Sequence, residues 1–319
     1  MAAALALAAR GQGRTAPNPN VGCILTAGGR IIGRGWTQPG GRPHAEAMAL
    51  AEAGAAAAGA TAYVTLEPCA HVSPRGPACT DLLIAARPAR VVAALGDPDP
   101  RTAGQGFARL RAAGIAVTEG VLAAEARRTM AGFLTRQALG RPHVTLKLAT
   151  SLDGRIALAS GESRWITGPE ARAHAHLERS RHEAILIGRG TWQTDTPGLN
   201  VRLAGLEERS PRRIVLTSSP LPNATEWTTI RSPQAIATLA GVDHLLIEGG
   251  AQTAAAFLAA DLVDRLLLYR APILIGHGKA ALGDIGLTSL AQAHGRWHRL
   301  DSRPLGSDHL DVYERRRSS

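Results

Sequence analysis

One histidine, one glutamate and two cysteines near the N-terminus have the types and the spacing of a catalytic zinc site. His44 and Glu46 stand at the start of a predicted helix, and Cys69, which follows a proline, precedes Cys79 by ten positions. One imidazole and two thiolates fill three corners of a zinc tetrahedron, and the fourth corner stays open for water. Zinc lowers the pKa of that water, and a carboxylate that is not a ligand, here Glu46, then carries protons to a ring nitrogen and a departing amine. The four residues therefore predict zinc-dependent deamination of a heterocycle.

The segments around these residues predict the elements that position them. The alanine-rich run 45–60 contains no proline and favours a helix, with His44 and Glu46 in its first turn. The apolar run 61–69 predicts a buried strand that ends at the first thiolate, and a short helix is predicted directly after Cys79. The dipole and the unpaired N–H groups at a helix N-terminus stabilise a thiolate there. Strand and helix ends would thus bring the zinc ligands together.

Other interpretations of these residues remain. Histidine and cysteine are often ordinary buried side chains, but the joint order of Glu46 two positions after His44 and a proline before Cys69 favours a metal site. A structural zinc would need a fourth protein ligand, for which His71 is available. The third cysteine, Cys23, lies in the apolar segment VGCILT and is interpreted as a core residue of a strand.

Length and composition set the broad class of the protein. A chain of 319 residues with 45% hydrophobic content can bury a sizeable core and form two domains. No apolar run reaches the roughly 18 residues of a membrane span, and the N-terminal segment lacks the basic start of a signal peptide. Three cysteines, two of them assigned to metal, favour a reducing compartment without disulfides. We therefore expect a soluble, cytoplasmic protein with no membrane partner.

The net charge of +10 raises the question of nucleic-acid binding. The basic residues are nearly all arginine, with Lys147 and Lys279 as the only lysines, and they are scattered along the chain. An aromatic content of 3% offers little for stacking bases. A positive field suits phosphorylated small substrates and a phosphorylated cofactor instead. We expect no nucleic-acid partner.

The first half of the chain alternates between predicted strands and helices. This alternation predicts parallel strands with helices on both faces of a sheet, and Gly28 and Gly29 predict a hairpin between the first two strands. Strands are predicted at 21–26, 30–36, 61–67, 89–97 and 115–120, and helices near the N-terminus, after His44, after Cys79, at 104–114 and at 122–136.

The pattern restarts near residues 140–142, which predicts a domain boundary there, with one domain at 1–141 and a second α/β domain at 142–319. Strands are predicted at 143–150, 184–191, 212–219, 244–250, 264–276 and 308–315, and helices at 168–181 and 250–262. His174 and His176, two apart on the first of these helices, are interpreted as surface residues.

A strand that ends in glycines is the main local signal of the second half. Ile247-Glu248-Gly249-Gly250 precedes a predicted helix, and such glycines let backbone N–H groups approach a phosphate at the helix N-terminus. A Gly-Gly turn alone is common, but the carboxylate of Glu248 directly before it favours a functional interpretation. The first strand is not followed by GxGxxG, so a nicotinamide cofactor would need a fold other than a Rossmann domain.

Six phrases together resemble the bifunctional riboflavin-biosynthesis deaminase/reductase family, and the resemblance covers almost the whole chain. They are PNPNVGC (17–23), HAEAMAL (44–50), GATAYVTLEPCAH (59–71), LKLATSLDGR (146–155), SGESRWIT (160–167) and LLIEGG (245–250). The zinc motif alone would fit many deaminases, whereas its pairing with SLDGR and SRWIT is far more specific. The family usually has one residue fewer between the two cysteines than the nine found here.

The resemblance implies two consecutive reactions of flavin synthesis. The N-terminal domain would have the three-layer αβα fold of cytidine deaminases and would hydrolyse the 2-amino group of 2,5-diamino-6-(5-phosphoribosylamino)pyrimidin-4(3H)-one. The C-terminal domain would resemble dihydrofolate reductase and would use NADPH to reduce the ribosyl side chain of the product to ribityl. The cofactors implied are Zn²⁺ and NADPH. The partners expected are phosphorylated pyrimidines and further copies of the chain in a homo-oligomer.

The resemblance also implies a role for individual residues. In the deaminase it matches the zinc ligands His44, Cys69 and Cys79, the proton carrier Glu46 and the substrate neighbours Asn20 and His71. In the reductase it matches polar active-site positions at Lys147 and Asp153, and substrate contacts at Ser163, Arg179, Arg202 and Glu248. It matches NADPH contacts at Ala149, Trp165, Thr191, Asp195, Leu199, Gly250, Ala251, Gln252 and Thr253. Trp165 could instead be a core residue, and Asp195 a turn residue.

Two other functions compete with this one. A zinc deaminase of another base, nucleoside or tRNA would need no NADPH, and its C-terminal half would lack reductase activity. An arginine-rich nucleic-acid binder without enzymatic activity would bind polynucleotides with a strong salt dependence.

Overall fold

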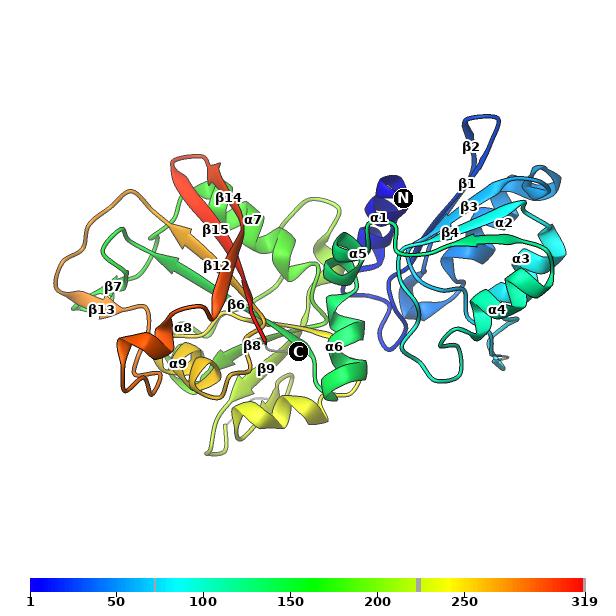
Figure 1. The fold of residues 1–319 in the computed structure, drawn as a ribbon. Helices are drawn as coiled ribbons and strands as arrows, with labels where there is room; N and C mark the ends of the chain where they lie inside the picture. Colours follow the sequence, from blue (N-terminus) through cyan, green and yellow to red (C-terminus); the bar gives the residue numbers. More distant parts are fainter. Residues whose placement is uncertain (72, 222–224, 318–319) are drawn as a thin grey trace. The chain divides into compact units, whose positions relative to one another are not determined.

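The computed structural model describes residues 1–71, 73–221 and 225–317, and the chain divides into two compact units, Met1–Gly140 and Arg141–Ser319. Each unit is built around its own sheet (Figure 1). Among the helices of the described residues, none is long and apolar enough to cross a membrane.

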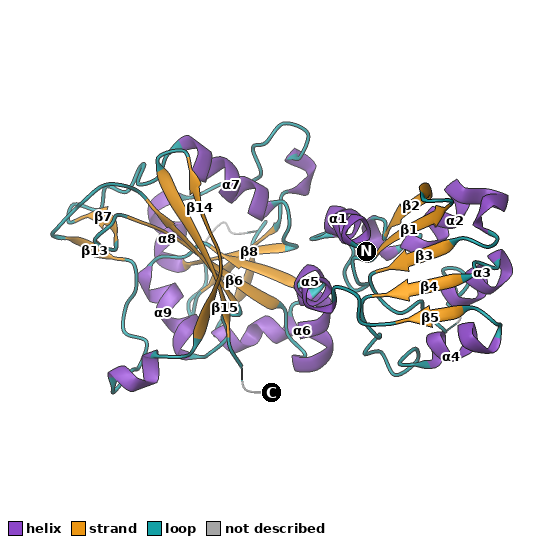
Figure 2. Ribbon diagram, turned by 45° about the horizontal axis from the view of Figure 1, so that its top comes forward, coloured by secondary structure: helices purple, strands orange, loops and turns teal. Residues whose placement is uncertain are grey.

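The first unit is a five-stranded sheet with helices. The strands are β1 (Gly22–Ala27), β2 (Arg30–Trp36), β3 (Thr61–Val64), β4 (Arg90–Ala93) and β5 (Ala116–Thr118), in the order β2-β1-β3-β4-β5 (Figure 2). The helices are α1 (Ala2–Ala8), α2 (Ala45–Ala53), α3 (Cys79–Ala86), α4 (Gln105–Ala112), α5 (Ala123–Thr129) and α6 (Ala131–Leu139), with short 3₁₀ turns at Ala9–Gly11, Pro39–Gly41 and Gly54–Ala57.

The sheet is mixed: the predicted parallel pairing is confirmed for β3, β4 and β5 but does not extend to β1. Strands β3, β4 and β5 are parallel, but β1 is antiparallel to both β2 and β3. The predicted hairpin is confirmed: Gly28 and Gly29 both have positive φ, so β2 returns antiparallel beside β1. The long helix predicted at 122–136 is two helices, because Met130 leaves helical geometry at φ −107° and ψ 22°.

Glycines in β1 and β2 bring helices close to both faces of the sheet. A Cβ at Gly22 would lie 1.9 Å from the Ala4 carbonyl oxygen of α1, and one at Gly35 would lie 1.9 Å from the Ala45 carbonyl oxygen of α2. Gly35 pairs with Cys23, the neighbour of Gly22, so these two glycines face opposite sides of the sheet. Helix α2 therefore begins directly against β2, which fixes the position of the residues around its first turn.

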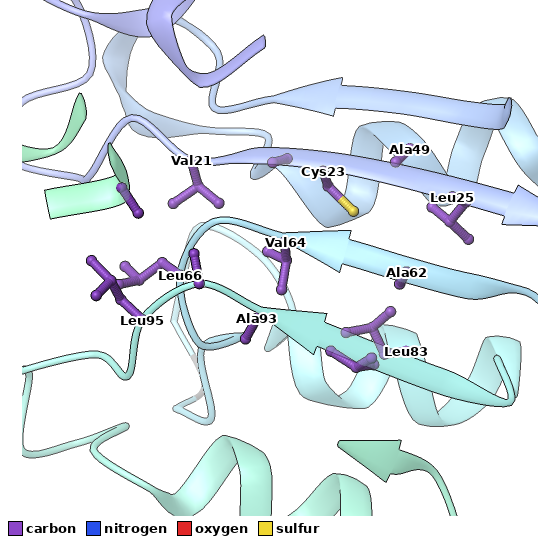
Figure 3. Packing of buried hydrophobic residues seen from close by; sticks show 14 of the residues in the cluster. Val21, Cys23, Leu25, Ala49, Ala62, Val64, Leu66, Leu83, Ala93 and Leu95 are labelled. Atoms are coloured by element: carbon purple, nitrogen blue, oxygen red, sulfur yellow. The ribbon is translucent and has the colours of Figure 1, made fainter. Parts of the chain in front are cut away.

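The core of this unit lies between the sheet and its helices (Figure 3). Val21, Cys23, Leu25 and Val64 meet Leu83 of α3 there. Burial raises the pKa of the Cys23 thiol well above its usual value. The interpretation of Cys23 as a core residue is confirmed.

The second unit has an eight-stranded sheet and a separate two-stranded one. The order of the large sheet is β10-β9-β8-β11-β6-β12-β15-β14, parallel from β10 to β12 and antiparallel for β15 and β14. Its strands are β6 (His143–Thr150), β8 (Ala184–Gly188), β9 (Arg212–Leu216), β10 (Thr228–Ile230), β11 (His244–Ile247), β12 (Arg265–Arg270), β14 (Trp297–Leu305) and β15 (Asp308–Arg315). Strands β7 (Arg155–Leu158) and β13 (Gly278–Ala280) form the small sheet.

The helices of the second unit are α7 (Pro169–Arg179), α8 (Arg189–Asp195) and α9 (Ala251–Ala259), with 3₁₀ turns at Glu207–Arg209, Pro233–Thr238 and Leu290–Ala293. The strand predicted at 184–191 ends at Gly188, and α8 begins at the next residue.

The interpretation of His174 and His176 as surface residues is wrong. His176 is buried, and His174 is half-buried with its Nδ1 2.7 Å from the Tyr269 hydroxyl.

Three histidines at the amino ends of β6, β8 and β11 should make this unit sensitive to acid. His143 and His244 are paired in register, and the His182 ring lies 6.1 Å from that of His244. Burial lowers the pKa of His143 to about 3 and that of His182 to about 4. Below pH 6.5 the unfolded chain binds protons that the folded chain does not, so stability falls as the pH falls from about 6.5 toward those values.

Between pH 7 and pH 5 each of these two histidines is expected to lower the free energy of unfolding by roughly 2 kcal/mol. Urea unfolding followed by tryptophan fluorescence suits the measurement, because every tryptophan except Trp36 lies in the second unit. The variant His143→Phe should lose about half of the pH dependence, and the exposed control His277→Phe should keep it all. An unchanged pH dependence in His143→Phe would show that this histidine is already protonated or solvated in the folded state.

Candidate active sites

His44, Cys69 and Cys79 converge in the first unit as a three-ligand metal site. The His44 Nδ1 lies 3.3 Å from the Cys79 Sγ and 3.6 Å from the Cys69 Sγ, and the three donor atoms are all within 4.8 Å of one another. A zinc ion with ordinary Zn–N and Zn–S bonds places its ligand atoms about 3.6 Å apart along the edges of a tetrahedron. The donor set and its spacing therefore fit zinc with one open position.

Each ligand of this site is held at the end of an element. His44 is the residue before α2, and Cys79 is the first residue of α3, whose backbone N–H donates to the Cys69 Sγ over 3.2 Å. The Cys79 thiol and this N–H, together with His44, lower the pKa of Cys69 to about 4. Hydrogen bonding to the Cys69 sulfur and burial raise the pKa of Cys79. One thiolate is thus preformed, and a divalent cation would favour deprotonation of the second.

Glu46 lies in the first turn of α2 beside this site. Its side chain is 3% exposed, and burial raises the pKa of its carboxyl to about 6. His44, Cys69 and Cys79 are also among the groups that act on the pKa of this carboxyl. A carboxyl whose pKa is near neutrality can both accept and return a proton. The structure thus brings the predicted proton carrier to the predicted metal ligands.

The structure places Asn18, rather than Asn20, next to His44. The Asn18 amide nitrogen lies 3.1 Å from the His44 Nε2 and donates to the Gly41 carbonyl, and this orients the Nδ1 toward the thiols. The Asn20 amide instead donates to the carbonyls of Ala8 and Thr129. The two asparagines stand in one PNPN segment, and nothing in their spacing distinguished them.

The loop between the two cysteines carries His71 and a basic side chain. The His71 Nδ1 lies 3.3 Å from the Thr102 hydroxyl, on the segment that follows β4. Arg75 donates to the Gly40 carbonyl over 2.6 Å, which ties the loop to the segment before His44. Of the nine loop residues, residue 72 lies outside the described residues.

The second unit contains a cavity of about 1060 Å³ at the carboxyl ends of its parallel strands. Ten residues that the sequence predicted for the reductase line it: Lys147, Ala149, Ser163, Thr191, Asp195, Glu248, Gly250, Ala251, Gln252 and Thr253. Such a position is where open α/β sheets bind ligands.

A buried ion-pair cluster stands at one end of this cavity. Glu248 accepts two hydrogen bonds from the Arg179 guanidinium, at 2.7 and 2.9 Å, and lies 3.6 Å from the Lys147 ammonium. Burial alone would raise the pKa of Glu248, yet Lys147 and Arg179 hold it at about 2. Glu248 is therefore ionised and keeps an ammonium group at the cavity wall.

Arg179, which belongs to this cluster, and Arg202 are not among the described residues that line the cavity. Arg202 contacts the buried His176, with its backbone N–H 3.3 Å from Nδ1 and its Nε 3.4 Å from Nε2. Burial and the two arginines lower the pKa of His176, so the imidazole is neutral near pH 7 and can accept from Arg202.

Three further predicted residues are also absent from the described lining of the cavity. Asp153 accepts hydrogen bonds from Ser151 and from the backbone N–H groups of Ile275 and Gly276, which lower its pKa to about 2. Trp165 is 64% exposed and lies under the Arg172 guanidinium. Leu199 is buried in an apolar cluster beside β8 and β9. Their predicted functional roles stay predictions.

Glycines bring the N-terminus of α9 against the strand ends. A Cβ at Gly188 would lie 2.1 Å from the Thr253 hydroxyl oxygen, and one at Gly249 would lie 2.6 Å from the Thr253 Cβ. Side chains at either position would push α9 away from β8 and β11. The predicted Gly-Gly phosphate turn therefore also has a packing role.

Sequence reasoning missed several residues that line the cavity. They come from α8, from the ends of β9 and β10, and from β13: Arg189, Gly190, Thr217, Ser218, Arg231 and Lys279. The glycine pair that flanks Arg189, directly after an apolar strand, is the one signal that could have indicated part of this set. The others are brought together only by the order of the strands in the sheet.

Comparison with known families gives a match in each unit. Residues 1–95 match the cytidine and deoxycytidylate deaminase zinc-binding region, and residues 142–309 match the RibD C-terminal domain.

Curated relatives match almost the full length of the chain. The riboflavin biosynthesis protein RibD of Escherichia coli K12 is 42% identical over an alignment 340 residues long, which covers 92% of this chain and 92% of that protein. RibD of Mycobacterium tuberculosis H37Rv is 40% identical over 313 residues, covering 94% and 91%.

Solved structures give the same result. Form 1 of Acinetobacter baumannii RibD has a TM-score of 0.86 and 37% identity, covering 99% of this chain and 98% of that one. The diaminohydroxyphosphoribosylaminopyrimidine deaminase/5-amino-6-(5-phosphoribosylamino)uracil reductase of Thermotoga maritima has a TM-score of 0.87 and 32% identity, covering 99% and 97%.

Proposed function

The chain belongs to the RibD family of riboflavin biosynthesis proteins and is a bifunctional deaminase and reductase, and we propose that its two reactions run at the two sites described above. The deaminase domain would comprise residues 1–141 and the reductase domain residues 142–319. The observation that carries the first assignment is the His44, Cys69 and Cys79 triad with Glu46 beside it. The cavity around Lys147 and Glu248 carries the second.

In the deamination, Glu46 is assigned the proton transfers. A zinc ion held by His44, Cys69 and Cys79 supplies the Lewis acidity that makes water nucleophilic at neutral pH. Glu46 takes a proton from that water as oxygen adds to the ring carbon that bears the 2-amino group. It gives this proton to the adjacent ring nitrogen, then takes the proton of the hydroxyl now bound to the ring carbon and gives it to the departing amine, so ammonia leaves as the carbonyl forms. Asn18 orients the His44 imidazole.

In the reduction, Lys147 is assigned the proton donation. NADPH supplies a hydride to the first carbon of the ribosyl group. As the bond from that carbon to the ring oxygen breaks, the ammonium of Lys147 gives a proton to the oxygen, and the open ribityl chain results. Glu248 holds the ammonium in place over 3.6 Å, and Arg179 keeps Glu248 ionised. Arg202 and Ser163 are assigned to the substrate phosphate and sugar.

Two further expectations extend this proposal. Exposed apolar side chains of the second unit, among them Leu152, Ile273 and Leu274, support a homo-oligomer, since Leu152 and Ile273 lie side by side with a backbone hydrogen bond of 2.9 Å. A monomeric mass by light scattering would contradict it. Phosphorylated pyrimidines as substrates, the absence of a nucleic-acid partner and a cytoplasmic location are proposed with it.

Removal of zinc is expected to separate the two activities. Dialysis against a chelator should lower ammonia release by at least about 100-fold, because the water loses its activating metal. NADPH binding should persist, since the triad and the cavity belong to different units. Added zinc should restore ammonia release with about one ion per chain by metal analysis. Full ammonia release from a metal-free preparation would overturn the mechanism.

A further inference from the structure

A buried tyrosine lies behind the wall of the cavity in the second unit, next to Lys147. Tyr269 of β12 is 1% exposed and is not among the described residues that line the cavity. Strand β12 is parallel to β6, and Tyr269 pairs in register with Ala149, two positions after Lys147. Side chains two apart on a strand share a face, so Tyr269 and Lys147 lie on the same face of the sheet.

The Lys147 ammonium has two printed neighbours of opposite character, a carboxylate and an aromatic ring. Its Nζ lies 3.6 Å from the Glu248 carboxylate and over the Tyr269 ring, 6.0 Å from the centroid. The contact with Glu248 is longer than an ordinary hydrogen bond, so it does not fix the ammonium by itself. An aromatic face attracts a cation within about 6 Å, more strongly away from water, and the Lys147 side chain is only 21% exposed. The ring thus adds a second restraint on the ammonium.

His174 of α7 holds the Tyr269 ring by its hydroxyl. The His174 Nδ1 lies 2.7 Å from that hydroxyl, and its Nε2 lies 3.0 Å from the Arg303 guanidinium. Burial lowers the pKa of His174, so the imidazole is neutral near pH 7. Arginine can only donate, so Nε2 accepts and the single proton of the imidazole is on Nδ1. His174 therefore donates to the Tyr269 hydroxyl and fixes the direction in which the ring points.

Packing alone does not account for a tyrosine at this position. The ring belongs to an apolar cluster with Ala171 of α7 and Leu310 and Val312 of β15, which would accommodate a leucine as well. A leucine would supply neither an acceptor for His174 nor an aromatic face for an ammonium. These two contacts distinguish Tyr269 from an ordinary core residue.

We propose that Tyr269, held by His174, is a positioning residue that keeps the Lys147 ammonium where it gives its proton to the sugar oxygen. The proposal rests on the assignment of proton donation to Lys147. A lysine carries its charge on a flexible four-carbon chain, and a displacement of about 1 Å at a reacting group can cost about 100-fold in rate. Tyr269 acts through Lys147, since it does not itself line the cavity.

The test introduces Tyr269→Leu into the wild-type protein and into Lys147→Met, with NADPH and the deaminated intermediate supplied. In the wild-type background kcat for NADPH oxidation should fall about 10-fold, because the ammonium is less well oriented. The KM of the intermediate and the Kd of NADPH should stay within about twofold. In Lys147→Met the same substitution should lower the residual rate by less than about twofold, since no ammonium is left to position. Equal losses in both backgrounds would overturn the proposal in favour of a structural role.

Tyr269→Phe tests the contribution of His174 and covers the case in which Tyr269→Leu does not fold. It keeps the ring and the volume but removes the acceptor for His174. Its kcat should fall about threefold in the wild-type background and should not fall in Lys147→Met. A wild-type kcat in Tyr269→Phe would overturn the role of His174, and a fall as large as that of Tyr269→Leu would overturn the role of the ring.

A second tyrosine of the same sheet provides the matched control. Tyr313 of β15 pairs with Leu266 of β12, which points to the face opposite to that of Tyr269, so Tyr313→Leu should oxidise NADPH at the wild-type rate. Loss of oxidation in Lys147→Met without any loss in Tyr269→Leu would contradict this inference alone. A wild-type rate in Lys147→Met would contradict the assignment of proton donation, and the inference with it.

Discussion

Glu46→Gln is expected to lower the rate of ammonia release by about 100- to 10,000-fold, the range that general acid–base catalysis supplies. The amide has nearly the same shape as the carboxyl, so it should leave α2 and the three metal ligands in place. It cannot accept the proton of the attacking water or return it to the amine. Zinc content should therefore stay at about one per chain while turnover is lost.

The control for this variant lies on the same helix. Glu52 of α2 is exposed and paired with Arg34 over 2.7 Å, so Glu52→Gln removes a carboxylate of the helix without touching the site. It should deaminate at the wild-type rate. Oxidation of NADPH by Glu46→Gln should also be normal when the deaminated intermediate is supplied. Ammonia release at an undiminished rate in Glu46→Gln would require another proton carrier.

Lys147→Met is expected to impair the reduction and to leave the deamination intact, the reverse of Glu46→Gln. NADPH oxidation should fall by about 100-fold or more, because the thioether has no proton to give to the sugar oxygen. Ammonia release should be unchanged, since Lys147 belongs to the second unit. Binding of NADPH, measured by titration, should change far less than turnover, which distinguishes loss of proton donation from collapse of the cavity.

Lys279 provides a matched comparison for this variant. It is the only other lysine of the chain, and it lines the same cavity from β13, near Gly161. Because it is not paired with Glu248, Lys279→Met should lower the rate much less than Lys147→Met. Equal losses in both variants would mean that a general positive charge, rather than a positioned proton donor, is what the reaction requires.

The zinc site was predictable from the sequence because its chemistry restricts both residue type and order. His44, Glu46 and Cys79 each lie at the start of a helix. The proline before His44 and the alanine-rich run after it indicate where the first of these helices begins. Asn18 was not predictable as the neighbour of His44, since Asn20 stands in the same motif and only the path of the chain before β1 distinguishes them.

The second site was predictable only in part, for a topological reason. Lys147, Glu248 and the Gly250 turn stand at the ends of long apolar strands that the sequence shows clearly. Arg231 follows β10, a strand of three residues with no clear alternation, and lies in the cavity because β10 pairs with β9. The edge strand β14 carries many polar side chains and was missed for a similar reason. Pairing between segments far apart in sequence decides these positions.

The competing functions differ from the family assignment in what they leave unexplained. If the protein were a zinc deaminase with an inert second half, the match of residues 142–309 to the RibD C-terminal domain would be unexplained. The basic composition that favoured a nucleic-acid binder is partly neutralised within the fold. Arg141 pairs with Asp264 over 2.7 Å, and Arg265 pairs with the buried Glu178 over 2.8 Å.

One assay tests most directly whether a single chain carries two active sites. The diaminopyrimidine ribotide is supplied to the wild-type protein with and without NADPH, and ammonia release and NADPH oxidation are followed separately. Ammonia should be released at the same initial rate in both cases, and NADPH should be oxidised only after a lag as the deaminated intermediate accumulates, finally in a ratio of one to one. Ammonia release without any NADPH oxidation, or oxidation that precedes deamination, would contradict the assignment of two consecutive reactions to these sites.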